Sequence, residues 1–144
     1  MKRTALLLVA LVGVSPLIAP AQEAKPYKDG PVSDVTFIRT KPGKFDDYLK
    51  WLAGPWKNLM EAQKKAGLVI GYAILETEPR TPHDANLILR ITFANMAALD
   101  KTDEADAVAA KVLGSNQQQN QGTIDRESLR EILGSQLTRE LILK

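Results

Sequence analysis

The chain has 144 residues, of which 44% are hydrophobic and 25% charged, and it contains no cysteine. This length predicts one domain, and the lack of cysteine excludes disulfides, thiolate metal sites and lipid attachment through a cysteine. The formal net charge of +2 includes Lys2 and Arg3, and without them 17 basic residues stand against 17 acidic ones. No basic surplus then remains to indicate binding to nucleic acid or to anionic lipid.

The first 21 residues have the pattern of a secretory signal peptide. Lys2 and Arg3 precede an apolar run from Ala5 to Val14, and Ala19 and Ala21 place small side chains at a cleavage site. The run is shorter than the roughly 20 residues that a membrane span needs. We therefore expect residues 1–21 to be removed, the protein to be exported to the periplasm or the extracellular space, and no membrane attachment after cleavage.

A polar lead over residues 22–31, which we expect to be flexible, precedes a single domain over residues 32–144. Its first strand is predicted at Val32–Thr40, because β-forming residues there end in a turn signal. Apolar residues at helical spacing from Phe45 to Gln63 then predict a helix. Pro55 inside it lacks a backbone N–H, so a kink or break is expected there.

The rest of the chain continues the alternation of strands and helices. The further predicted elements are strands at Leu68–Glu76 and Asn86–Phe93, a short turn at Met96–Leu99, a helix at about Asp103–Leu113, a polar loop at Ser115–Gln121, a short helix from Ile124 to Leu133 ended by Gly134, and a closing strand at Leu137–Leu143. This order predicts an α+β fold, the ferredoxin-like βαββαβ two-layer sandwich with a four-stranded antiparallel sheet.

In such a sandwich the helices cover one face of the sheet, and the other face meets water or a partner. The strand positions less suited to the core are Thr36, Ile38, Val69, Ala73, Leu75, Ile88, Arg90, Thr92, Thr138 and Ile142. Half or more of them are apolar, which is too many for a solvated face. We therefore predict a homodimer that associates through the sheet.

Three segments resemble a known superfamily. The run from Val35 to Tyr48 resembles the strand–turn–helix opening of the dimeric α/β-barrel proteins, in particular their NIPSNAP-like and antibiotic-biosynthesis-monooxygenase-like branches. Phe93–Asp100 and the ending from Arg130 through Ile142 resemble their later segments. The resemblance implies that two sheets pack face to face as a dimeric barrel, with a cavity between helices and sheet in each subunit.

Members of this superfamily include cofactor-free monooxygenases and haem-handling enzymes. The former hold a phenolic substrate with tryptophan, tyrosine and asparagine, and Trp51, Asn58 and Tyr72 supply those residue types. The haem-binding members present a histidine from a helix, whereas His83 lies in a proline-rich loop. We therefore expect no haem and no other cofactor. With one histidine and no cysteine, we also predict no metal site.

The residues proposed for ligand binding are Arg39, Trp51, Tyr72 and Arg90. Trp51 beside the helix break and Tyr72 in an apolar strand are predicted to line a pocket, with Arg39 or Arg90 supplying charge for an anionic or phenolic group. The alternative is that all four are packed or paired within the dimer, because strand arginines commonly pair with carboxylates.

The sequence contains no catalytic motif, so whether the protein is an enzyme stays open. The first interpretation is an exported dimeric protein that binds a small aromatic or anionic molecule or serves a structural role. One alternative is a cofactor-independent monooxygenase acting on a small aromatic or phenolic substrate, and another is an interaction module for an envelope protein.

Overall fold

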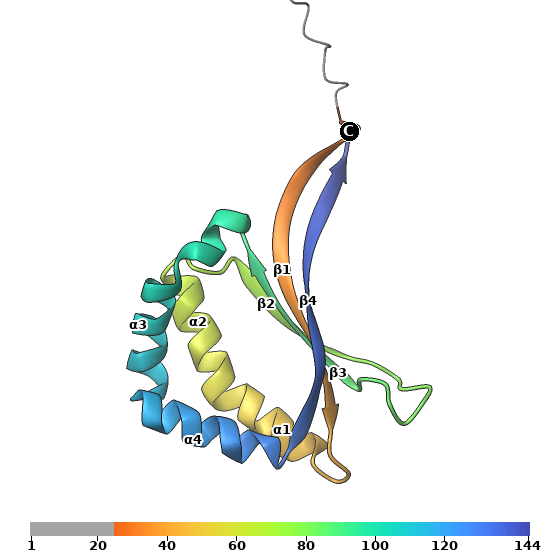
Figure 1. The fold of residues 1–144 in the computed structure, drawn as a ribbon, viewed down its shortest axis with the longest axis vertical. Coiled ribbons are helices and arrows are strands. Elements are labelled where there is room, and N and C mark those ends of the chain that lie inside the picture. The colour runs from red at the N-terminus through yellow and green to blue at the C-terminus, as the bar shows by residue number, and fades with distance from the viewer. Residues whose placement is uncertain (1–24) are drawn as a thin grey trace, which may run out of the picture.

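The computed structural model describes residues 25–144, so the predicted signal peptide lies outside the described residues. The elements in chain order are β1 (Tyr27–Thr40), α1 (Phe45–Trp51), the π-helical turn η1 (Leu52–Trp56), α2 (Lys57–Lys65), β2 (Gly71–Glu76), β3 (Leu87–Phe93), the 3-10 turn η2 (Met96–Asp100), α3 (Thr102–Leu113), α4 (Asn116–Glu127) and β4 (Arg130–Leu143). The strands form one antiparallel sheet in the order β2-β3-β1-β4. All of these helices lie on the same side of it (Figure 1). This α+β architecture is consistent with the predicted ferredoxin-like fold.

The first strand is longer than its sequence pattern predicts, because it begins at Tyr27 rather than at Val32. Tyr27 pairs with Leu143 and Asp29 with Leu141, so part of the predicted flexible lead is sheet. The register shifts between Asp29 and Val32, where Pro31 lies. Proline is tolerated at a bulge because a residue there need not donate a backbone N–H to the neighbouring strand. The paired ends Tyr27–Asp29 and Leu141–Leu143 form an arm that extends beyond the helices (Figure 1).

The predicted irregularity at Pro55 takes the form of the π-helical turn between α1 and α2. The backbone N–H of Lys57 donates to the carbonyl of Leu52 across this widened turn. A widened turn accommodates a residue that has no N–H to give. The chain therefore continues in the same helical layer, and Leu52 and Trp56 both stay buried.

The segment between α3 and β4 differs most from the prediction. Residues 115–121, predicted as a solvated loop, begin α4. Ser115 and Gln118 form a capping box, in which each side chain accepts a hydrogen bond from the other's backbone N–H, at 3.4 and 2.8 Å. The short helix predicted as far as Leu133 is wrong, because the chain is already strand from Arg130.

The core lies between the helices and the middle of the sheet. Its buried residues are Ile38, Tyr48, Leu52, Trp56, Met60, Leu87 and Leu89. Ile38 pairs with Leu87 and Thr36 with Leu89, so Thr36 and Ile38 face the helices, contrary to the outward positions predicted for them. Val69 is also buried. Val35, Phe37 and Ile38 are all apolar, and such a run has no period-two signal from which the facing can be predicted.

The face turned away from the helices, which we call the open face, has an apolar half and a polar half. Phe37, Ile88 and Leu75 lie side by side across β1, β3 and β2 in one row. Ser33 and Thr92 lie in another row, where their hydroxyls are 3.0 Å apart. Within residues 25–144, no helix is long and apolar enough to cross a membrane.

Candidate functional site

Two arginines and two aromatic rings meet where the end of α4 approaches α1. The guanidinium carbon of Arg126 lies 4.4 Å from the centroid of the Trp51 ring, and that of Arg130 lies 5.6 Å from the centroid of Tyr48. The two rings are parallel, with centroids 6.0 Å apart. Such cation–π contacts hold both guanidinium groups beside the helical layer.

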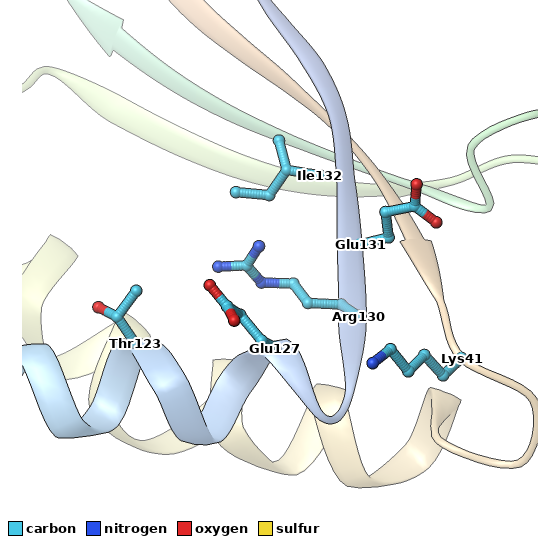
Figure 2. Close-up of a pocket in the computed structure, with 6 residues that line it drawn as sticks. All are labelled: Lys41, Thr123, Glu127, Arg130, Glu131 and Ile132. Carbon is cyan, nitrogen blue, oxygen red and sulfur yellow. The ribbon is translucent and has the colours of Figure 1, made fainter.

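A pocket of about 490 Å³ adjoins this cluster at the junction of α4 and β4. Its lining residues are Lys41, Thr123, Glu127, Arg130, Glu131 and Ile132, and we call it the α4–β4 pocket. Figure 2 shows Arg130 and Ile132 projecting from β4 toward the side on which α4 lies, with Thr123 and Glu127 on that helix. Basic groups and an apolar side chain thus share one concave surface, as in many small-molecule sites.

Arg126 and Arg130 have no carboxylate within ion-pair distance among the described residues. The Nε atom of each is buried without a hydrogen-bond partner. Burial lowers the pKa of Arg126, and the charge of Arg130 lowers it further. Burial raises the pKa of Tyr48, while the charges of Arg130 and Arg126 oppose that shift. Two arginines without an ion-paired carboxylate in the described part of the chain therefore lie next to a neutral phenol, and the charge of Asp125 opposes part of the lowering of the pKa of Arg126.

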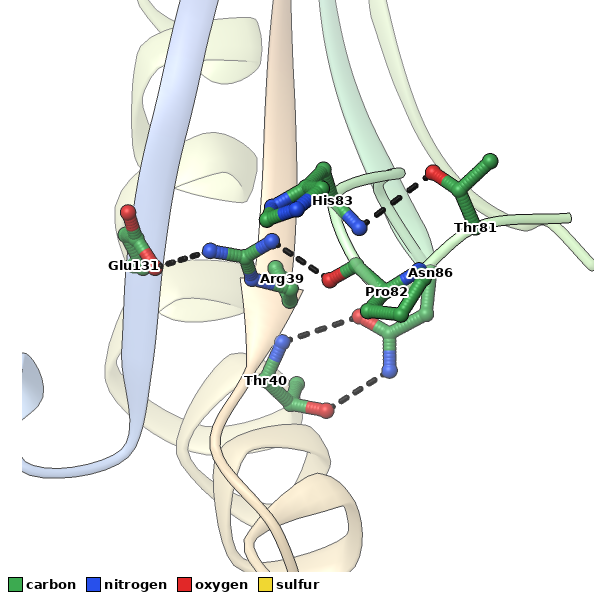
Figure 3. Close-up of polar contacts among 7 residues, drawn as sticks. All are labelled: Arg39, Thr40, Thr81, Pro82, His83, Asn86 and Glu131. Carbon is green, nitrogen blue, oxygen red and sulfur yellow. Dashed lines mark hydrogen bonds and ion pairs between the residues drawn. The ribbon is translucent and has the colours of Figure 1, made fainter. Parts of the chain in front are cut away.

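Arg39 instead joins two segments of the chain. Its guanidinium donates to Glu131 and to the carbonyl of Pro82, both at 2.6 Å. Asn86 hydrogen-bonds both the backbone N–H and the hydroxyl of Thr40 beside it, as Figure 3 shows. These bonds join the loop between β2 and β3 to β1, and Arg39 also joins β1 to the edge strand β4, so Arg39 has a structural role.

Arg90 lies on the open face, since it pairs with Val35 and Ala73 while its neighbours Leu89 and Ile91 face the helices. It borders a depression of about 370 Å³ lined largely by polar residues of β1, β3 and β4. Trp51 and Tyr72 are on the helical side. The four residues predicted for one pocket are thus on opposite faces of the sheet, and the structure does not bring them together.

Tyr72 and Trp51 also have separate surroundings. The Tyr72 hydroxyl donates to Glu61, which raises the pKa of Tyr72, and its ring meets Trp56 edge-on at 5.2 Å. Trp51 packs against Tyr48 and Arg126, and Asn58 is exposed. The tryptophan, asparagine and tyrosine weighed for a monooxygenase therefore make no common site.

The residues of the α4–β4 pocket were not among those predicted to bind a ligand. A signal for them exists in Ser115-Asn116-Gln117-Gln118, which matches the capping-box pattern and predicts a helix start. A helix from there brings Arg126 into its last turn, where a cation is favoured by the helix dipole. His83 is exposed in its loop. Among residues 25–144, no three His, Asp or Glu side chains gather in a metal-binding arrangement.

Two solved structures are similar to this chain. One is HapK from Hahella chejuensis, with a TM-score of 0.50 and 12% identity, covering 76% of this chain and 91% of that one. The other is protein SO0527 from Shewanella oneidensis, with a TM-score of 0.50 and 16% identity, covering 81% and 98%. No protein-family model and no curated protein matches the sequence. At these identities the similarity establishes the fold alone.

Proposed function

We propose that the protein is an exported small-molecule-binding protein, that its ligand occupies the α4–β4 pocket, and that it works as a homodimer. The observation that carries the binding role is the pair of arginines, Arg126 and Arg130, whose buried Nε atoms lack partners beside a pocket of about 490 Å³. Buried polar groups in folded proteins are nearly always hydrogen-bonded. A bound molecule at this junction would supply the missing acceptors.

The binding role can be tested by screening small molecules against the mature chain while recording amide chemical shifts. We expect ligands that shift the amides of Lys41, Thr123, Arg130 and Ile132 together, since these residues line the pocket. Molecules that shift only Arg90 and its neighbours on the open face, or a library without any binder, would contradict the proposal.

The homodimer is supported by the apolar half of the open face. Leu75 is 43% exposed, and it lies on the face that no helix of the described chain covers. The apolar row of Phe37, Ile88 and Leu75 would be buried if two open faces packed together, as two packed sheets bury their facing side chains. A dimeric α/β barrel is the arrangement that this packing would form.

Export is supported by the sequence pattern of residues 1–21. Mass spectrometry of the protein from its own host should find an N-terminus at Gln22, in a fraction outside the cytoplasm. A chain that keeps Met1 and stays in the cytoplasm would refute export without touching the binding role.

A further inference from the structure

We infer that the ligand of the α4–β4 pocket is a carboxylate with an aliphatic tail. This inference rests on the binding role proposed above and adds the chemistry of the ligand. The carboxylate would bind Arg130 and Lys41, and the tail would lie over Ile132 and continue along β4 toward Leu137. The charge of the pocket and the pattern of β4 lead to this assignment.

The charge around the pocket favours an anion. The cations in its lining are Lys41 and Arg130, and Arg130 has no ion-paired carboxylate among the described residues. Of the two carboxylates in the lining, Glu131 is paired with Arg39 at 2.6 Å, so only Glu127 is left to oppose the two cations. Asp125 accepts a hydrogen bond from Gln121 at 2.9 Å, and its charge opposes that of Arg126, which lies outside the pocket lining.

Arg130 is better placed than Arg126 to meet the ligand. Arg126 stacks on Trp51 and donates to the hydroxyl of Thr123 at 2.8 Å, so its position is fixed by the protein. Arg130 lines the pocket, and its buried Nε atom has no hydrogen-bond partner among the described residues. A guanidinium binds a carboxylate through two parallel N–H donors, which makes Arg130 the natural headgroup contact.

The tail is inferred from the helix-facing side of β4. Ile132 pairs with buried Ile38, and Leu137 pairs with Asp34, which shares the helix-facing side of β1 with Ile38. Yet Ile132 is 53% exposed and Leu137 is 52% exposed. Apolar groups bare on this side, next to a cationic pocket, fit an amphiphile better than a plain anion.

The test is calorimetric titration of the mature chain with decanoate, octanoate, decanol, benzoate and inorganic phosphate. We expect saturable binding of decanoate, weaker binding of octanoate by about twofold for each missing methylene on a half-open surface, and at least about tenfold weaker binding of decanol. Phosphate or benzoate binding as tightly as decanoate would overturn the inference, because neither has an aliphatic tail.

Variants locate the headgroup. Arg130→Gln and Lys41→Gln should each weaken decanoate binding, the former by at least about tenfold. Arg90→Gln is the matched control, since it removes the same charge from the open face and should leave the affinity unchanged. Loss in Arg90→Gln, or no loss in either pocket variant, would overturn the assignment. Circular dichroism establishes that each variant is folded.

A second pair of variants locates the tail. Ile132→Ser should reduce the difference in affinity between decanoate and octanoate, whereas Leu141→Ser in the arm should not. An unchanged difference in Ile132→Ser overturns the inferred path. If decanoate does not bind but another molecule shifts the pocket amides, the ligand class is wrong and the binding role survives. If no molecule shifts them, both proposals fail.

Discussion

Ile38 and Ile132 are neighbours in the same sheet, yet their surroundings differ almost completely. They pair directly across β1 and β4, and both face the helical side. Ile38 is 1% exposed because α1 and η1 cover it, whereas Ile132 is 53% exposed. The middle of the sheet is covered by helices of the same chain, whereas the helix-facing side of the edge strand β4 is largely uncovered. Apolar side chains left bare on an edge strand indicate a surface that something else covers.

The largest difference should appear when the two isoleucines are shortened. Ile38→Ala should lower the free energy of unfolding by about 2–5 kcal/mol, because it leaves a cavity in a packed core. Ile132→Ala should lower it by less than about 1 kcal/mol, since a half-exposed side chain loses few contacts. Urea unfolding measures both. Equal costs would mean that β4 is covered as fully as β1.

Charge on the open face should separate the proposed homodimer. Ile88→Asp would put an unpaired carboxylate into the row formed with Phe37 and Leu75, and should weaken association by at least about 100-fold. Ile132→Asp is the matched control, because it lies on the other face and should leave the dimer intact. Sedimentation velocity distinguishes them, and a wild-type monomer at micromolar concentration would refute the pairing.

A smaller effect is expected at the start of α4. Gly114 has φ +87°, and a Cβ added there would lie 2.1 Å from the side-chain oxygen Oε1 of Gln118. This oxygen accepts the hydrogen bond from the backbone N–H of Ser115 in the capping box. Gly114→Ala should therefore cost about 1–2 kcal/mol of unfolding free energy. Gly122→Ala, inside the same helix with only an ordinary contact, should stabilise by about 0.5–1 kcal/mol. Thermal unfolding measures both changes in stability. The prediction is wrong if the two variants change stability in the same direction.

The smallest expected effect is one of pH. Burial raises the pKa of Tyr48, so the folded state favours the protonated phenol. As the pH rises through the ordinary range of tyrosine, the unfolded chain loses this proton first, and stability is lost progressively. Tyr48→Phe should make the alkaline fall in stability shallower, whereas Tyr27→Phe in the arm should not. Identical slopes in both variants would contradict the buried position of Tyr48.

Much of the architecture could be predicted from the sequence, because strong local patterns determine it. The four strands, the interrupted first helix and the helix before Gly114 follow from periodicity and from proline and glycine. The helix at α4 was missed because its glutamines and asparagines carry no apolar stripe, and its start depends on a cap formed by Ser115 and Gln118. Tertiary contacts at its end then keep it in place.

The candidate site was harder to predict than the fold, because it depends on register. Arg39 and Arg90 are on the opposite face from Tyr72, and a shift by one residue would have reversed that arrangement. Arg126 and Arg130 lie on either side of a helix-to-strand boundary that was placed several residues too late. Sequence patterns locate such boundaries poorly, and the direction of a side chain beside one depends on them.

The pairing of β1 with β4 also has a consequence for the order of folding. The strand β1 lies between β3 and β4 in the sheet, and both follow it in the chain. Of the two, β4 is far away in sequence, at residues 130–143. The first pair of β1 with β4, Thr40 with Arg130, joins residues 90 positions apart (130 − 40), so β1 gains its second neighbour only late in the chain. Contacts this distant in sequence slow folding. The sheet is therefore completed last at β4, and β1 keeps one unpaired edge until residues 130–143 are available.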